Sequence, residues 1–300
     1  MWEVDGFVKL SDKVRNKLEK SIKEYGVRRL GRDLKFDRET IDSIYRGKKF
    51  IHSVSHLIKI ARTLSYNLED LEKEVVSFGR RQANMYNILF PFNVNPLHVR
   101  AITIQGDGCY NRLTGQCSWY QKHDRVYFMD NLIQILLKDK TDLSRIKDEK
   151  ISYVTIPSVL VHLISKSLRL KPEEIDSIKF FEVICKLPQE FQFQVFSQFI
   201  IDEGHFKGTT FTVSQWKEET RRGFIKLLDN LGFKHSNPKN GKDDITIYGL
   251  NFPIILNLLD KANNKYGNIA GFWFKEGQFR DICRRANPHN SYKLVKKRLE

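Results

Sequence analysis

The stretch FQFQVFSQFIIDEGHF (Phe191–Phe206) has the hydrophobic spacing of a buried helix. Phe196, Phe199 and Glu203 recur at three- and four-residue intervals, which places them on one helical face. We expect Gly204 to end the helix as a left-handed C-cap, so that Glu203 falls in the last turn. A carboxylate there is disfavoured by roughly 0.3–1 kcal/mol, because a helix C-terminus carries partial negative charge. Glu203 is therefore a candidate functional residue.

The same construction occurs a second time, earlier in the chain. Pro96–Tyr110 is an apolar-leaning segment that ends in Asp107 and Gly108, and Asp107 lies 96 positions before Glu203. Each segment precedes an alternating, strand-like stretch that closes on a glutamine, followed by a helical pattern. Two further pairs of segments match in the same order: Gln116–Leu136 with Thr209–Leu228, and Tyr153–Ile164 with Ile245–Leu259. An internal duplication of about a hundred residues accounts for these matches.

The N-terminal part of the chain has a different rhythm of short helical patterns. Ser11–Tyr25 predicts a helix with Ser11 as its N-cap and Gly26 as its end. From Val27 to Leu71 the helical pattern is interrupted at Phe36–Asp37 and again at Gly47. This spacing is typical of a helix-turn-helix unit.

Length, composition and cysteine spacing limit the class of protein to which this chain can belong. The chain has 300 residues, 41% of them hydrophobic, which is enough for about two domains with real cores. No apolar run reaches the length of a membrane span, and the first ten residues lack a signal-peptide pattern, so we expect a cytoplasmic protein. The four cysteines have no CxxC spacing, and this argues against a zinc knuckle or a redox pair.

The net charge of +15 indicates a polyanionic partner, since each Lys or Arg that meets a phosphate releases counterions. A membrane surface is the competing polyanion. The basic residues are not gathered on one amphipathic helix, so we expect nucleic acid and no membrane.

RAITIQGDG (Arg100–Gly108) and FSQFIIDEG (Phe196–Gly204) resemble the nine-residue motif of the two-repeat LAGLIDADG homing endonucleases. The resemblance implies an α+β fold in which two motif helices pack at a pseudo-twofold axis and two antiparallel sheets form a saddle over a DNA duplex. It also implies a monomer. Terminal motif acids in this family hold Mg²⁺ or Mn²⁺ over the scissile phosphates, and strand-end glutamines order water. The positions in this chain that match the catalytic and metal-binding roles are Asp107, Glu203, Gln121 and Gln215, with Gly106 and Asp202 as further metal ligands.

Two departures from that family pattern are visible. A basic residue often ends the later strand of each repeat, but the nearest lysines here, Lys150 and Lys242, precede it. Small residues are usual at the third and seventh motif positions, whereas the second copy has Gln198 and Asp202 there. A second function therefore stays open: a transcription regulator of the WhiA type, which binds DNA through an inactive LAGLIDADG scaffold and a helix-turn-helix.

The segment Val27–Leu71 resembles the Cro/C1-type repressor domain, with Asp37 as the cap of its second motif helix. Such domains are all-α, and their second helix enters the major groove. Expected base-reading positions are Arg38, Glu39, Thr40, Asp42 and Ser43, and expected phosphate contacts are Arg28, Arg29, Arg32, Arg46, Lys48, Lys49, Lys122 and Lys217. A helical bundle that binds protein instead of DNA is the alternative.

These patterns predict a domain order. We expect a helix-turn-helix domain over 1–78, a linker over 79–96, repeats over 97–175 and 176–263, and a basic helical extension over 264–300. Within the first repeat, Asp124–Lys138 is expected to be a helix and Asp139–Glu149 a charged loop. The extension contains an aromatic cluster, Phe272–Phe274 with Phe279, followed by many Arg and Lys residues that belong either to a solvated surface or to a phosphate contact.

Overall fold

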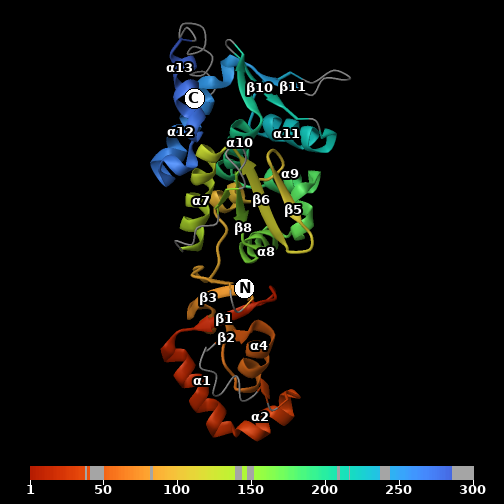
Figure 1. The fold of residues 1–300 in the computed structure, drawn as a ribbon, viewed down its shortest axis with the longest axis vertical. Helices are drawn as coiled ribbons and strands as arrows, with labels where there is room; N and C mark the ends of the chain where they lie inside the picture. The colour runs from red at the N-terminus through yellow and green to blue at the C-terminus, as the bar shows by residue number, and fades with distance from the viewer. Residues whose placement is uncertain are drawn as a thin grey trace. The chain divides into compact units, whose positions relative to one another are not determined.

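A computed structural model describes residues 1–37, 39–40, 51–81, 84–138, 144–146, 152–207, 210–215, 217–236 and 244–285 (Figure 1). The fold is α+β with antiparallel sheets, as predicted. The chain divides into two compact units: residues 1–93 with 134–141 and 158–167 form one, and residues 94–133, 142–157 and 168–300 form the other. Among the described helices, none is both long and apolar enough to span a membrane.

The N-terminal unit is not all-α. Its strands β1 and β3 pair in antiparallel fashion, and β2 and β4 extend the sheet in the order β2-β1-β3-β4. The pairing joins residues about seventy positions apart, as in Val8 opposite Phe78, which local periodicity does not reveal. Residues 79–81 and 84–86, which we expected in a linker, belong to β3 and β4. The elements are β1 (Phe7–Leu10), α1 (Asp12–Tyr25), α2 (Val27–Leu34), β2 (Ile51–Ser53), α4 (Val54–Thr63), α5 (Leu68–Lys73), β3 (Val75–Arg81) and β4 (Asn84–Tyr86).

The helix ends in this unit follow the sequence signals. Ser11 Oγ accepts a hydrogen bond from the Val14 amide at 3.4 Å, and Gly26 ends α1 with a φ of 95°. Asp37 Oδ1 accepts from the Thr40 amide at 2.6 Å, as the expected cap should. The remainder of the expected reading helix lies outside the described residues.

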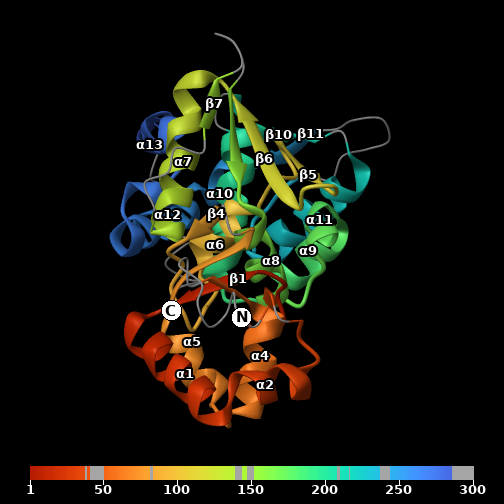
Figure 2. The same cartoon turned by 60° about the horizontal axis from the view of Figure 1, so that its bottom comes forward.

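The second unit contains two sheets with one topology (Figures 1 and 2). One has the order β5-β6-β8-β7 and the other the order β11-β10-β9, so that β5-β6-β8 corresponds to β9-β10-β11. A single bridge between His235 and Ile247 stands where β7 pairs with β8. The strands are β5 (Gly108–Asn111), β6 (Gln116–Gln121), β7 (Ser144–Ile146), β8 (Ser152–Ile156), β9 (Gly204–Lys207), β10 (Thr210–Ser214) and β11 (Asp244–Ile247).

β7 lies inside the segment that we expected to be a charged loop, because three residues there complete the edge of the sheet. The first flanking helix is as predicted to within one residue. The helices of the repeats are α6 (Pro96–Ala101), α7 (His123–Leu137), α8 (Ser158–Ser167), α9 (Ile178–Ile184), α10 (Gln189–Asp202), α11 (Glu218–Asn230) and α12 (Phe252–Tyr266), with α13 (Glu276–Arg285) after them and short 3-10 turns η1 (Pro172–Asp176), η2 (Gly249–Asn251), η3 (Asn268–Ala270) and η4 (Trp273–Lys275) between.

The two motif segments, α6 and α10, pack side by side in the second unit. α10 is buried over most of its length, whereas α6 is short and residues 102–107 continue as turns. The rings of Phe196 and Phe199 stack on Phe224 of α11, at centroid distances of 6.3 and 4.5 Å. This aromatic contact attaches the second repeat's flanking helix to its motif helix.

The described part of the C-terminal extension, residues 264–285, contains the helix α13 and packs into the core through its aromatic residues. Phe272 and Phe279 are buried, and Phe272 lies 6.0 Å from Phe193 of α10. Arg280 pairs with Asp260 at 2.7 Å and with Glu276 at 2.9 Å, so these contacts occupy the guanidinium within the unit. Aromatic content outweighed charge in deciding where this segment packs.

Gly223 allows α11 to approach α9. A Cβ added at Gly223 would overlap the ring of Phe181, whereas one added at Gly277 of α13 would meet nothing within 4 Å. We predict that Gly223→Ala lowers the free energy of unfolding by about 1–3 kcal/mol through overpacking. The control Gly277→Ala should be neutral or raise it by up to about 1 kcal/mol. Urea unfolding of both variants tests this, and equal stability would contradict the packing.

Candidate active site and nucleic-acid interface

Asp107 and Glu203 occupy matching positions in the two repeats. Asp107 directly precedes β5, and Glu203 is the last residue before β9. The Asp107 carbonyl accepts from the Tyr120 amide at 2.8 Å, and the Glu203 carbonyl accepts from the Ser214 amide at 3.3 Å. Each acid is therefore held at the base of a hairpin by the strand that follows.

Close packing, and not the left-handed backbone conformation that we expected, explains why a glycine follows each acid. Gly204 is not a left-handed cap: Glu203 caps α10, and Gly204 begins β9 without a positive φ. An added Cβ would overlap the Phe211 ring at Gly204 and would lie 2.6 Å from the Ile104 Cβ at Gly108. The acid-glycine pair therefore reflects close packing where the strand leaves the motif segment.

Three carboxyl groups affect one another at this site. Burial raises the pKa of Asp107 to about 6, against the hydrogen bond from Gln121 and the charge of Lys275. Burial, and then the charge of Asp107, raise the pKa of Glu203 to about 7. Burial, and then Asp107, also raise the pKa of Asp202. The structure thus brings the two motif acids and Asp202 within electrostatic reach of one another.

Asp202 lies where the two motif segments touch. Its Oδ1 accepts from Trp119 Nε1 at 3.0 Å and from Gln198 Nε2 at 2.9 Å. Its Oδ2 is out of contact with solvent and has no hydrogen-bond partner among the described residues. A Cβ added at Gly106 would lie 2.6 Å from the Asp202 Cβ, so Gly106 permits this close approach.

The two strand-end glutamines differ. Gln121 Nε2 donates to Asp107 Oδ2, and Gln121 Oε1 accepts from Arg125 Nη1 at 3.3 Å. Gln215 is buried; its Nε2 donates to the Gln105 carbonyl at 3.1 Å, and its Oε1 accepts from the Lys217 amide at 3.0 Å. The Gln121 side chain therefore contacts a motif acid, while the Gln215 side chain bonds to main-chain atoms.

Lys275 is the residue at this site that sequence reasoning missed. Its Nζ donates to the carbonyls of Ile200, Ile201 and Gly204, at 2.7, 2.6 and 2.5 Å. Burial lowers the pKa of Lys275 to about 8, although Asp202 opposes this shift. Lys150 and Lys242, the lysines nearest to the later strands in sequence, lie outside the described residues. The one available signal was a lysine directly after three aromatic residues, Phe272–Phe274.

Arg100 was also missed as part of the site's support. It is fully buried, and its guanidinium donates to Gln198 Oε1 at 3.3 Å, Gln194 Oε1 at 3.2 Å and the Gly271 carbonyl at 2.7 Å. The group also lies 4.4 Å from the centroid of the Trp273 ring. Burial lowers the pKa of Arg100 to about 9, and the charge of Asp202 opposes this.

The donor chemistry suits a hard divalent cation. Among the described residues, no three His, Cys, Asp or Glu side chains are arranged to hold a metal. Mg²⁺, however, is usually bound through one or two carboxylates, with waters and substrate phosphates as the other ligands. Asp107 and Glu203 supply oxygen donors, and both interact electrostatically with Asp202, whose Oδ2 has no hydrogen-bond partner among the described residues. The residues present therefore fit Mg²⁺ or Mn²⁺ once phosphates join them.

Some of the expected DNA contacts lie within the described residues, and the others lie outside them. Arg28, Arg29 and Arg32 are exposed on α2, as is Glu39 beyond it, whereas Thr40 is half-buried. Lys122 is exposed after β6, and Lys217 lies 3.5 Å from Asp176. The other expected contacts lie outside the described residues: Arg38, Asp42, Ser43, Arg46, Lys48 and Lys49.

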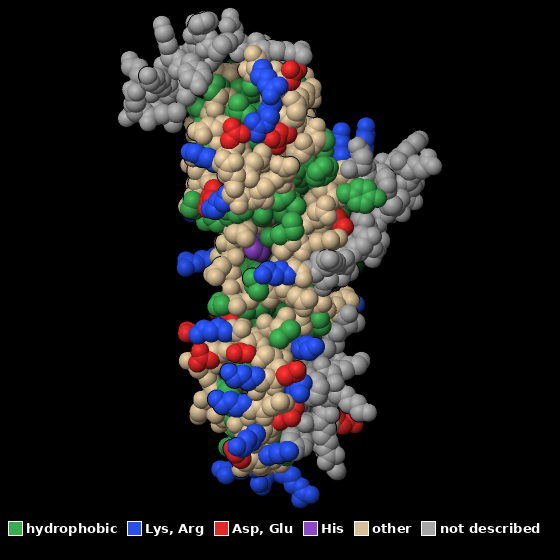
Figure 3. All heavy atoms as spheres, turned by 90° about the vertical axis from the view of Figure 1, so that its left-hand side faces the viewer, with side chains coloured by type: hydrophobic (Ala, Val, Ile, Leu, Met, Phe, Trp, Pro, Cys, Tyr) green, Lys and Arg blue, Asp and Glu red, His purple; other side chains and the backbone are tan. Residues whose placement is uncertain are grey.

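The face in Figure 3 shows Lys and Arg of the N-terminal unit interspersed with Asp and Glu. On α1, Arg15 pairs with Asp12 at 2.7 Å and Lys20 with Glu24 at 3.8 Å. Arg29 of α2 also pairs with an acid, Asp33, at 3.8 Å, so both helices carry ion pairs on their surfaces.

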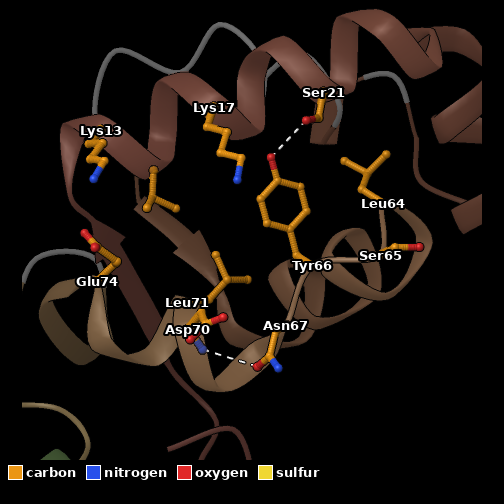
Figure 4. A pocket seen from close by; sticks show the side chains of 11 residues that line it. Lys13, Lys17, Ser21, Leu64, Ser65, Tyr66, Asn67, Asp70, Leu71 and Glu74 are labelled. Atoms are coloured by element: carbon orange, nitrogen blue, oxygen red, sulfur yellow. Dashed lines mark hydrogen bonds between the residues drawn. The ribbon is translucent and has the colours of Figure 1, made fainter.

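A hollow in the N-terminal unit lies between α1 and the turn from α4 to α5 (Figure 4). Tyr66 points toward α1 and bonds Ser21 Oγ at 2.9 Å, with Lys17 Nζ 5.6 Å from its ring. The hollow is lined by lysines as well as by acidic residues, so its charge favours neither an anionic nor a cationic ligand.

The raised pKa of Glu203 predicts a pH-dependent stability. The folded state binds this proton more tightly, so the stability from the protonated group is lost as pH rises from about 4.5 to about 7. This rise in the pKa of Glu203 would correspond to roughly 3 kcal/mol of folding free energy for a fully buried group. Because Glu203 is partly exposed, solvent screening reduces the effect to about 1 kcal/mol. Glu203→Gln should therefore equal the wild type at pH 4 and be about 1 kcal/mol more stable at pH 8 with EDTA present. Urea unfolding at both pH values measures this; an equal difference at both would contradict it.

No family model and no curated protein sequence matches this chain. Among solved structures, a mesophilic variant of the homing endonuclease I-DmoI aligns over 55% of this chain and 96% of its own, with 13% identity and a TM-score of 0.38. The meganuclease I-SmaMI, bound to uncleavable DNA, aligns over 68% and 96%, with 13% identity and a TM-score of 0.36. Similarity at this level supports no functional statement about this chain.

Proposed function

We propose that this protein binds double-stranded DNA and cleaves it as a divalent-metal-dependent endonuclease of the LAGLIDADG type. The observation that supports this most is the meeting of Asp107 and Glu203 at equivalent hairpin bases, each with a raised pKa. Carboxyl groups held close together without a cation are unfavourable, which is typical of sites that bind one. The chain acts as a monomer whose two repeats supply the two acids.

The side chains have separate tasks in this proposal. Asp107 and Glu203 hold the metal, and Asp202 and the carbonyl of Gly106 are further candidate ligands. A bound Mg²⁺ or Mn²⁺ polarises the phosphate and lowers the pKa of a ligated water. Gln121, already on Asp107, orients solvent on one side, whereas its counterpart Gln215 is buried and bonded to the main chain. Lys275 places positive charge beside the group of acids.

A transcription regulator with an inactive scaffold is the second candidate. It is favoured by the difference between the glutamines, because Gln215 bonds the main chain where Gln121 bonds an acid. Both candidates require DNA binding, and they differ only in whether the bound duplex is cut.

We propose that both units bind one duplex, since two linked modules raise the local concentration of each other's site. In this proposal the helix-turn-helix contributes through α2 and the segment after it. A net charge of +15 supplies the electrostatic attraction.

The first test concerns the arginines of α2. Replacing Arg28, Arg29 and Arg32 together by Ala should weaken binding and reduce the slope of log affinity against log salt by up to about 3, at about 0.9 per phosphate contact. The control replaces Lys13, Lys17 and Lys20 of α1 by Ala, with the same loss of charge. Fluorescence anisotropy on a selected duplex measures both. Equal losses would show that α2 makes no specific contact.

The second test separates nuclease from regulator. Asp107→Asn or Glu203→Gln should reduce cleavage of a duplex selected by binding by roughly a hundredfold or more, because each removes a carboxylate ligand of the metal that the reaction needs. Affinity should be unchanged or higher without metal, since a carboxylate that faces phosphates opposes binding. The exposed change Glu219→Gln serves as the control, and Mg²⁺, Mn²⁺ and EDTA are compared. A wild type that binds the duplex tightly but leaves it whole with either metal would favour the regulator.

A further inference from the structure

Lys275 closes the C-terminal end of α10. The carbonyls that it binds belong to Ile200, Ile201 and Gly204, around the residues where α10 passes into β9. A helix C-terminus carries partial negative charge, and its last carbonyls lack partners within the helix. An ammonium group has three donors, and three carbonyl oxygens receive them here. This lysine is therefore a cation bound by main-chain oxygens.

The segment that carries Lys275 is anchored on both sides. The Trp273 ring stacks on Phe128 at 5.5 Å and meets Trp119 edge-on at 6.0 Å, while its Nε1 donates to the Ile269 carbonyl at 3.0 Å. Trp273 has a φ of 47°, a left-handed conformation that a bulky residue adopts only when its surroundings impose it. A turn with a constrained backbone thus places Lys275 at the end of α10.

Lys275 interacts electrostatically with the acidic side chains of the site. The charge of Lys275 acts on both Asp107 and Glu203, and Asp202 and Arg125 in turn act on Lys275. Carbonyl and carboxylate oxygens are the ligands that Mg²⁺ and Ca²⁺ use in proteins. An ammonium group that occupies three of these carbonyls excludes a metal from them and repels a second positive ion nearby.

We propose that Lys275 is a tethered cation that occupies the α10 end of the acid cluster and restricts divalent-metal binding there. The inference rests on the metal site of the proposed function, but it concerns metal affinity and not cleavage. The ammonium group occupies main-chain carbonyls that a metal could otherwise bind. A metal that binds the carboxylates of Asp107 and Glu203 must therefore overcome repulsion from the charge of Lys275.

The test is metal affinity in the full chain without DNA. Calorimetric titration with Mn²⁺ should show that Lys275→Met binds at least tenfold more tightly than the wild type, because repulsion is removed and three carbonyls are released. Lys275→Arg retains the charge and should keep the wild-type affinity. Lys261→Met, which removes an exposed lysine from α12, controls for net charge and should also leave affinity unchanged.

Lys275→Gln covers the case in which the methionine variant does not fold, because its amide still donates to carbonyls while carrying no charge. It should also bind Mn²⁺ at least tenfold more tightly than the wild type. Mn²⁺ affinity in the neutral variants no higher than in the wild type, including no binding in any of them, would overturn the role of Lys275. Cleavage by the wild-type protein is scored separately. A wild type that cuts DNA while the variants bind metal equally would defeat this inference and leave the nuclease proposal standing.

Discussion

The buried guanidinium of Arg100 is the constraint on which the rest of the second unit depends. Removing a charge from water is costly unless hydrogen bonds and opposite charge replace the water. Two glutamine oxygens from α10, one main-chain carbonyl from Gly271 and the face of Trp273 surround this group. Because these partners come from two other stretches of chain, satisfying one cation of α6 fixes α6, α10 and the C-terminal segment together. The same segment then brings Lys275 to the end of α10.

This constraint also explains why the second motif departs from the small residues usual in the resembling family. Gln198 accepts from Arg100 through Oε1 and donates to Asp202 Oδ1 through Nε2, so one amide links a buried cation to a buried acid. A small residue at this position would leave both charges without that bond. Trp119 supplies the second donor to Asp202 from β6 of the other repeat. The contact between the motif segments therefore includes buried hydrogen bonds beside its apolar residues.

Local signals predicted the parts of the fold that depend on neighbouring residues. The helix around Phe196–Phe199, the hairpin that ends in Gln121 and the matching order of the two sheets all follow from periodicity and repetition. The pairing of β1 with β3 could not be predicted this way, since its partners are far apart in sequence. Lys275 escaped for the same reason: its ligands are main-chain carbonyls some seventy residues earlier, and carbonyls carry no sequence signature. Gly204 was placed correctly but for the wrong reason, because packing against the Phe211 ring depends on tertiary structure.

The two halves of the site share a backbone plan but not an environment. Asp107 carries a hydrogen bond from Gln121, which Arg125 supports, whereas Glu203 adjoins the carbonyl of Gly204 that Lys275 binds. Glu203 is followed by a hairpin two residues shorter between its bonded partners, since Ser214 lies eleven residues after it and Tyr120 thirteen after Asp107. Duplication gives both acids the same starting geometry, and burial raises the pKa of each, to about 6 for Asp107 and to about 7 for Glu203. A cation that enters this site therefore meets a hydrogen-bonded carboxylate at Asp107 and, at Glu203, a carboxylate whose neighbouring carbonyl already binds an ammonium group.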